Sequence, residues 1–177
     1  HVLVRHEMAA SFMADAYAKV TGHVGVCLST VGPGATNMLT GLATSYSDSV
    51  PVIAMTGQIS TELQGRGYQQ EVDHVRLFRV VTKYSTRITV SSQIPKVVRK
   101  AFRTALTGRR GPVHLDLPKD VLLNQTCVRT KETKRYRADN RIVYEPNLAR
   151  EAVELLLMGE KPVILILGGS QGARRIN

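Results

Sequence analysis

The sequence predicts an α/β fold: a doubly wound, mostly parallel sheet with helices on both faces. Two short apolar runs, residues 24–29 and 52–56, and the alternating segment GPVHLDLPKD have the pattern of strands. Between them lie longer segments whose apolar residues recur at helical spacing. Short buried strands that alternate with helices are typical of a parallel sheet covered on both faces. Hydrophobic residues make up 43% of the chain, which is enough to form such a core.

The first half of the chain contains the elements in alternating order. An apolar run at residues 2–4 has strand character, and a helix is expected to follow it and to end at Gly22, a glycine stop signal. The β-branched segment VGVCLS at residues 24–29 predicts the next strand. Residues 30–49 contain a Gly-Pro-Gly turn and then a helical pattern. The strand VIAMT follows, and we expect Gly57 to close it.

The second half continues this pattern after a long polar segment. Residues 58–74 are polar, contain two glycines in GRGYQQ and are expected to form a loop. Loops of this length are often functional. A strand is expected in KYSTRITV, residues 83–90. The most regular helix follows it: Ser91 or Ser92 can cap its start, and Gly108 ends it. The strand in GPVHLDLPKD comes next and ends at a proline.

The domain organisation that we expect has three parts. Residues 1–123 form a first domain that is truncated at its N-terminus. Residues 124–145 are polar, basic and poor in aliphatic residues, so they are expected to be a linker. Residues 146–177 have the pattern of a helix followed by a strand, PVILIL, and are expected to begin a second α/β domain that is also truncated.

The charge is unevenly distributed. The net charge is +10, and residues 74–115 contain ten Lys or Arg residues and no Asp or Glu. A nucleic-acid site is one interpretation. The interval has few aromatic residues and no nucleic-acid motif, so a solvated face or a surface for anionic ligands or partner subunits is favoured. No apolar stretch is long enough to span a membrane, and no cluster of residues has metal-ligand spacing.

Two local features could carry chemistry. Glu7 lies where the apolar run meets the helix start, either as a partner of the helix dipole or as a working acid. The segment STVGPGATN places a Gly-Pro-Gly turn between a strand and a helix. Such a turn lets backbone amides approach a ligand closely, although it is equally consistent with a tight connection of purely structural role.

Several separated motifs resemble one family. RHEMAASFMADAYAKVTG, GPGATN, YQQEVDH, TKYS and GRRGPVHLDLPKDV occur in the order found in the pyrimidine-binding domain of thiamine-diphosphate enzymes, and they are most similar to the acetolactate synthase branch. The resemblance covers residues 1–123, and the tail from Pro146 resembles the start of that family's central domain. It implies that the chain is part of a longer enzyme and is inactive by itself.

The resemblance implies roles for individual residues. Glu7 matches the glutamate that hydrogen-bonds a ring nitrogen of the aminopyrimidine and so promotes loss of the thiazolium proton; in an apolar cleft its pKa would be raised. Gln70 would face the reacting end of the cofactor as a second catalytic residue, and Lys83 would lie on the substrate side. The pyrimidine pocket would be lined by Pro33, Gly34 and Asn37.

The resemblance also implies cofactors and partners. Thiamine diphosphate would be bound with Mg²⁺, whose ligands lie outside these residues because the family's GDG…NN motif is absent here, and FAD is a further cofactor of the branch. A second subunit would complete the active site in a homodimer or tetramer, with a regulatory subunit as a further partner. The expected location is the cytoplasm, or an organelle in a plant or fungus.

The function implied is that of a 2-oxo-acid carboligase, most simply acetolactate synthase. Such an enzyme decarboxylates pyruvate and transfers the acetaldehyde unit to a second 2-oxo acid. One departure is Gln69, which stands where acetolactate synthases usually carry Phe. Two alternatives therefore stay open: another thiamine-diphosphate decarboxylase or lyase of the same family, and an inactive pyrimidine-domain module.

Overall fold

The structure is a computed structural model that describes residues 1–127 and 145–161. The chain divides into two compact units, residues 1–138 and 139–177. In the first unit the elements, in chain order, are α1 (Glu7–Thr21), β1 (Gly25–Ser29), α2 (Pro33–Asn37), α3 (Leu39–Ser47), β2 (Val52–Gln58), η1 (Thr61–Leu63), α4 (His74–Phe78), η2 (Arg79–Val81), β3 (Tyr84–Arg87), η3 (Ser91–Gln93), α5 (Ile94–Leu106), β4 (Val113–Pro118) and α6 (Lys119–Leu123). The second unit contains α7 (Pro146–Met158).

The strands form one parallel sheet in the order β1-β2-β4-β3. Strand β1 pairs with β2 from Gly25 opposite Val52, and β4 pairs with both β2 and β3. Because all strands are parallel, their carboxyl ends lie along one edge of the sheet. The predicted α/β class with a parallel sheet is confirmed.

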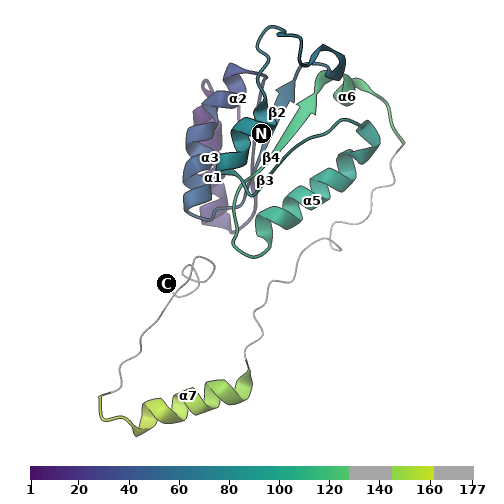
Figure 1. Cartoon of the computed structure of the whole chain (residues 1–177). Helices are drawn as coiled ribbons and strands as arrows, with labels where there is room; N and C mark the ends of the chain where they lie inside the picture. The colour runs from purple at the N-terminus through teal and green to yellow at the C-terminus, as the bar shows by residue number, and fades with distance from the viewer. Residues whose placement is uncertain (128–144, 162–177) are drawn as a thin grey trace. The chain divides into compact units, whose positions relative to one another are not determined.

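Helices cover both faces of this sheet (Figure 1). Strand β2 shows why: its residues alternate between two apolar cores. Val52 and Ala54 pack in the core beneath α1 and α3, together with Met38, Leu42 and Phe78. Ile53 and Met55 face the other core, which α5 covers with its buried alanines. The sheet is therefore the middle of three layers, and β2, an inner strand of the sheet, begins with four apolar residues because helices cover both of its faces.

Helix α1 has well-defined ends. His6 caps its start, where its Nδ1 accepts a hydrogen bond from the N–H of Met8. Gly22 ends it in the left-handed conformation, with a φ of 71° and its N–H bonded to the carbonyl of Ala18. This is the glycine stop that the sequence predicts, and it satisfies a carbonyl that the helix leaves unpaired.

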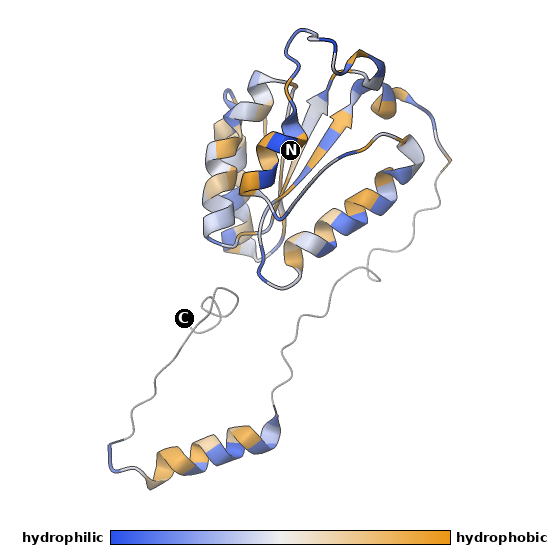
Figure 2. Cartoon of the chain, viewed as in Figure 1, coloured by the Kyte–Doolittle hydropathy of each residue, from blue (hydrophilic) through white to orange (hydrophobic). Residues whose placement is uncertain are grey.

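Helix α5 is the amphipathic helix that the sequence predicts. Its apolar and polar bands are visible in Figure 2. Ala101 and Ala105 are fully buried against the sheet, while basic side chains occupy the other side. Ser91 and Ser92 lie in the preceding single turn η3 and do not cap the helix; its N-cap is Gln93, without a side-chain hydrogen bond, so the predicted serine cap is wrong. Pro95 occupies the first turn, where the missing N–H costs nothing.

The structure corrects four details of the sequence analysis. Residues 1–4 are not a strand. Strand β2 does not end at Gly57 but continues to Gln58. The polar segment is not one loop, because it contains η1 and ends in helix α4, whose first residue is His74. Strand β3 is shorter than KYSTRITV.

The predicted second domain is described only in part. Helix α7 is present, as its apolar spacing predicts. The PVILIL strand and most of the predicted linker lie outside the described residues. Among the helices of residues 1–127 and 145–161, none combines the length and apolar character needed to cross a membrane.

Candidate functional site

Glu7 lies at the first position of α1, at the carboxyl edge of the sheet. Its side chain is half-buried, and Oε2 accepts a hydrogen bond of 3.0 Å from Nδ2 of Asn37, at the end of α2. This hydrogen bond, helped by the backbone N–H of Glu7 itself, lowers the pKa of the carboxyl group below its ordinary value. The raised pKa expected for an apolar cleft is therefore wrong for this chain, because an amide donor outweighs the small effect of burial.

The Gly-Pro-Gly turn follows β1 and approaches Glu7 closely. A Cβ atom on Gly34 would lie 3.2 Å from Oε1 of Glu7 and 2.7 Å from Cγ2 of Thr30. Any side chain at this position would therefore fill the space beside the carboxylate. Pro33 is exposed and begins α2. The structure thus brings together Glu7, Gly34 and Asn37, three of the residues that the sequence analysis placed in one pocket, with Pro33 beside them.

Gln70 contacts the same turn through its backbone. A Cβ atom on Gly32 would lie 2.6 Å from the carbonyl oxygen of Gln70, so only glycine fits here. Gly32 also has a φ of 64° and a ψ of −114°, which other residues rarely adopt. Gln70 itself has a φ of 62°, an uncommon value for a residue with a side chain, and its side chain is exposed.

Glu71 holds the loop that presents Gln70. Its carboxylate accepts hydrogen bonds from the backbone N–H groups of Gly65 and Tyr68, the latter at 3.1 Å. These donors lower the pKa of this exposed carboxyl group, the bond from Gly65 most strongly. Glu71 therefore orders the loop as a backbone acceptor.

Lys83 lies at the opposite edge of the sheet. It directly precedes β3, where its N–H donates to the carbonyl of Pro112 just before β4. Its Nζ donates to the carbonyls of Thr104 and Thr107 at the end of α5, the second at 2.7 Å. Burial lowers the pKa of this amine. The structure does not bring Lys83 together with Glu7 and Gln70. Instead, Lys83 hydrogen-bonds the C-terminus of helix α5, where a cation is favourable.

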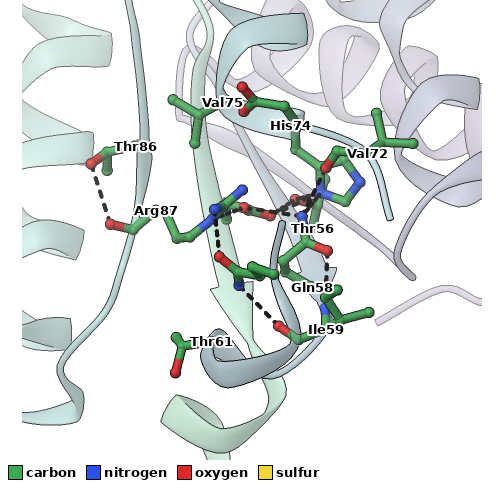
Figure 3. A network of polar contacts seen from close by, with 12 residues as sticks. Thr56, Gln58, Ile59, Thr61, Val72, His74, Val75, Thr86 and Arg87 are labelled. Carbon is green, nitrogen blue, oxygen red and sulfur yellow. Dashed lines mark hydrogen bonds and ion pairs between the residues drawn. The ribbon is translucent and has the colours of Figure 1, made fainter. Parts of the chain in front are cut away.

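The sequence analysis missed a buried polar network under the turn (Figure 3). His74 and Arg87 reach it from opposite sides (Figure 3). Both contact the carboxylate of Asp116. Asp116 is fully buried and accepts from Nε of Arg87 at 2.7 Å, from Nδ1 of His74 at 2.8 Å and from Oγ1 of Thr56 at 2.9 Å. Burial alone would raise the pKa of Asp116, but these donors lower it.

The network lies on one face of the sheet. Thr56 on β2 and His114 and Asp116 on β4 point to the side that α1 and α3 cover, by the same alternation that sends their neighbours to the other core. His74 enters from the start of α4. The signal in the sequence was polar residues at alternate positions of HLDLP. A single strand pattern cannot show that their partners come from helix α4 and strand β3.

The arrangement joins a carboxylate, an amide and a glycine turn at the edge of the sheet. In a parallel α/β sheet, ligands bind outside the carboxyl ends of the strands. Within residues 1–127 and 145–161, no group of three or more His, Cys, Asp or Glu residues is placed to hold a metal ion. The chemistry that the described residues offer is hydrogen bonding and proton exchange at Glu7.

Comparisons with known proteins show what the chain is similar to. Residues 1–77 match the family described as thiamine pyrophosphate enzyme, N-terminal TPP binding domain. This segment contains Glu7, the Gly-Pro-Gly turn and Gln70. The resemblance to the thiamine-diphosphate enzymes is thereby confirmed.

Several curated proteins similar to this chain are named acetolactate synthases. The chain is 44% identical over 178 residues to the probable acetolactate synthase large subunit of Methanocaldococcus jannaschii. It is 44% identical over 173 residues to the acetolactate synthase isozyme 3 large subunit of Escherichia coli, and 42% identical over 175 residues to the acetolactate synthase of Arthrospira platensis. Each comparison covers 96% of this chain, which spans about 30% of the length of these curated relatives.

Proposed function

We propose that this chain is the cofactor-activating part of a thiamine-diphosphate-dependent acetolactate synthase. The observation that carries the proposal is the hydrogen-bonded Glu7–Asn37 pair beside the glycine turn. The similarity to acetolactate synthase large subunits over nearly the whole chain supports it. Pyruvate and a second 2-oxo acid are the substrates proposed.

The residues present fit an aminopyrimidine ring. Gly34 leaves open a space beside Oε1 of Glu7 that a Cβ atom would fill, while Asn37 holds the other carboxylate oxygen. When bound, the cofactor supplies the chemistry that breaks the bond between the carboxylate and carbonyl carbons of the 2-oxo acid. The role of Glu7 is to share a proton with a ring nitrogen through Oε1. Asn37 keeps the carboxylate ionised and oriented for that exchange.

The remaining parts of the proposal lie outside the described site. We propose that Mg²⁺ and the cofactor's diphosphate are held by residues beyond this chain, and that FAD is a further cofactor. A second subunit would complete the site, and the description of the relatives as large subunits supports a regulatory partner. The proposed domains are residues 1–123, a linker at 124–145 and the start of a central domain at 146–177, in a cytoplasmic or organellar enzyme.

One observation favours a second candidate within the same class. Gln69 replaces the Phe that acetolactate synthases usually carry, and it directly precedes Gln70 in the loop. A polar side chain there changes the wall that a substrate would meet. A related thiamine-diphosphate decarboxylase or lyase, or a pyrimidine domain without catalysis, is therefore the alternative.

The substitution Glu7→Gln in the intact protein tests the proposal. The amide keeps the size of the side chain and removes its capacity to take up a proton. We expect carbon dioxide release and acetolactate formation from pyruvate to fall by about 10² or more, as for the loss of a general acid–base group. Glu151→Gln, the same change at an exposed position of α7, is the control.

The outcomes separate the candidates. Full activity of the Glu7→Gln variant would show that Glu7 is only a helix-start residue. Carbon dioxide release by the wild type without acetolactate would favour the decarboxylase alternative. A wild type that neither binds thiamine diphosphate nor releases carbon dioxide would support the inactive module.

A further inference from the structure

His74 has different partners at its two ring nitrogens. Nε2 lies 3.1 Å from the backbone N of Gly32, whose N–H can only donate. Nε2 must therefore carry a lone pair, which leaves the proton of the neutral ring on Nδ1. Nδ1 lies 2.8 Å from Oδ1 of Asp116 and donates to it. The surroundings thus determine one tautomer of a side chain that is fully buried.

Both carboxylate oxygens of Asp116 accept further hydrogen bonds. Oδ2 accepts from Nε of Arg87 at 2.7 Å, and Oδ1 accepts in addition from Oγ1 of Thr56. Arg87 is oriented in turn by the side chain of Gln64, to which its Nη1 donates. An ion pair on the β3 and β4 strands therefore sets the position of the His74 ring. The ring in turn fixes the backbone of Gly32 by accepting its N–H.

Gly32 is the point at which the candidate site is joined to the core. It precedes Pro33, the first residue of α2, and α2 ends at Asn37, which holds Glu7. Its other side packs on the backbone of Gln70. A shift of Gly32 would move the turn relative to both Glu7 and Gln70.

We propose that His74 is a positioning residue of the candidate cofactor site, which aligns the Gly-Pro-Gly turn by accepting the Gly32 N–H while Asp116 and Arg87 hold its ring. The ligand class in this inference, an aminopyrimidine cofactor, rests on the proposed function. The role of His74 on the turn rests on the contacts alone. Each part has its own measurement.

His114 supplies an internal comparison. It is also fully buried in the same network, yet it does not contact the turn. Its Nε2 lies 2.9 Å from Oγ1 of Thr56, a hydroxyl that also donates to Oδ1 of Asp116. Its Nδ1 lies 2.8 Å from Oγ of Ser85, which also donates to the carbonyl of Val75, so both ring nitrogens of His114 face hydroxyl groups and neither contacts Gly32. A change at His114 disturbs the core without removing the acceptor for Gly32.

Two substitutions of His74 separate its two contacts. His74→Gln places an amide oxygen near the position of Nε2, so it can still accept from Gly32, but it loses the aligned donor to Asp116. His74→Asn keeps an N–H near the position of Nδ1 for Asp116, but it is too short to reach Gly32. His114→Gln is the matched control for a polar change in the same layer.

The first measurement is nuclear magnetic resonance on the isotope-labelled chain. Long-range proton–nitrogen spectra should show the Nδ1–H tautomer for His74. Exchange of the Gly32 amide should be about tenfold or more faster in His74→Asn than in the wild type, a loss of about 1.4 kcal/mol of local protection. It should stay near the wild-type rate in His74→Gln and His114→Gln.

The second measurement is the dissociation constant of thiamine diphosphate in the intact protein. We expect it to rise by about tenfold or more in His74→Asn and by about threefold or less in His74→Gln. An equal loss in both variants, or an Nε2–H tautomer at His74, would overturn the proposal. If the wild type binds no thiamine diphosphate while the exchange pattern is as expected, the positioning of the turn stands and the proposed function fails.

Discussion

The buried side chain of His114 makes the stability of the folded chain depend on pH. It stacks on the ring of Phe78 at a centroid distance of 3.9 Å and has no contact with water. Burial is the largest cause that lowers the pKa of His114 to about 3, with Asp116 acting in the opposite direction and His74 and Arg87 adding to the decrease. In the folded chain, His114 therefore stays neutral at any physiological pH.

The difference between the pKa of His114 in the folded chain and its ordinary value predicts how stability depends on pH. The ordinary pKa of the group is 6.5, so between pH 6.5 and about 3 the unfolded chain binds a proton at His114 that the folded chain does not. The free energy of unfolding should therefore fall as the pH falls through this window, by up to about 1.4 kcal/mol per pH unit. Above pH 6.5 the contribution is fully present.

Urea unfolding at pH 7 and pH 5 measures the effect. His114→Gln keeps a polar side chain but cannot titrate, so the difference in unfolding free energy between the two pH values should shrink. The pKa of Asp116 is lowered from 3.8, so the stability that Asp116 contributes is lost only at pH values below the interval from pH 7 to pH 5. An unchanged difference in the variant would mean that other groups cause the pH dependence.

At the scale of elements, α1 packs unusually closely on its two neighbours. A Cβ atom on Gly25 would lie 2.0 Å from the carbonyl oxygen of Ala14, and one on Gly41 would lie 2.2 Å from Oγ of Ser11. The buried side chains of the helix are correspondingly small and include Ser11, Ala14 and Ala18. This packing places the start of α1, and with it Glu7, against the turn.

The substitution Gly41→Ala tests the close packing of α1 on α3. Added methyl groups in a tightly packed region usually cost about 1–3 kcal/mol, and Gly41 faces backbone as well as side-chain atoms of α1. We expect that loss in the free energy of unfolding measured with urea. Gly57→Ala is the control, since its Cβ would have no neighbour closer than 3.7 Å. Equal effects of the two substitutions would contradict this account.

At the scale of the whole molecule, the basic interval 74–115 has several separate roles. Arg87 belongs to the buried network, and Lys83 serves the end of α5. Arg109 donates to Oγ of Ser49 and to carbonyls at the end of α3. The basic residues therefore do not form one surface, and those on α5 are a solvated helix face.

The resulting prediction concerns nucleic acid. We expect non-specific duplex DNA to bind the chain only weakly, with a shallow fall in affinity as salt rises from about 50 to 200 mM, because scattered basic residues would neutralise few phosphates. Fluorescence anisotropy of a labelled duplex, titrated at several salt concentrations, measures this. Tight binding that persists at physiological salt would restore the nucleic-acid interpretation.

Much of the site could be predicted because it is local in sequence. Glu7 was found at the start of a predicted helix, although the strand expected before it is absent from residues 1–4, and the glycines of the turn were found from their spacing, since few residue types suit such positions. The placement of Asn37 in the same pocket as Glu7 followed only from the resemblance, and their hydrogen bond was not predicted. The lowered pKa of Glu7 was missed, because it depends on an amide thirty residues further along the chain.

The sequence by itself determined the α/β class, the helix end at Gly22 and the motifs that resemble those of thiamine-diphosphate enzymes, whereas α5 ends at Leu106 with Thr107 as its cap, before the predicted Gly108. These features depend on periodicity, on glycine conformation and on short segments. Only the tertiary structure decided that Lys83 lies at the far edge of the sheet, and that His74, Arg87 and Asp116 meet beneath the turn. Strand order and the burial of polar partners arise from contacts between distant segments, which a local pattern does not contain.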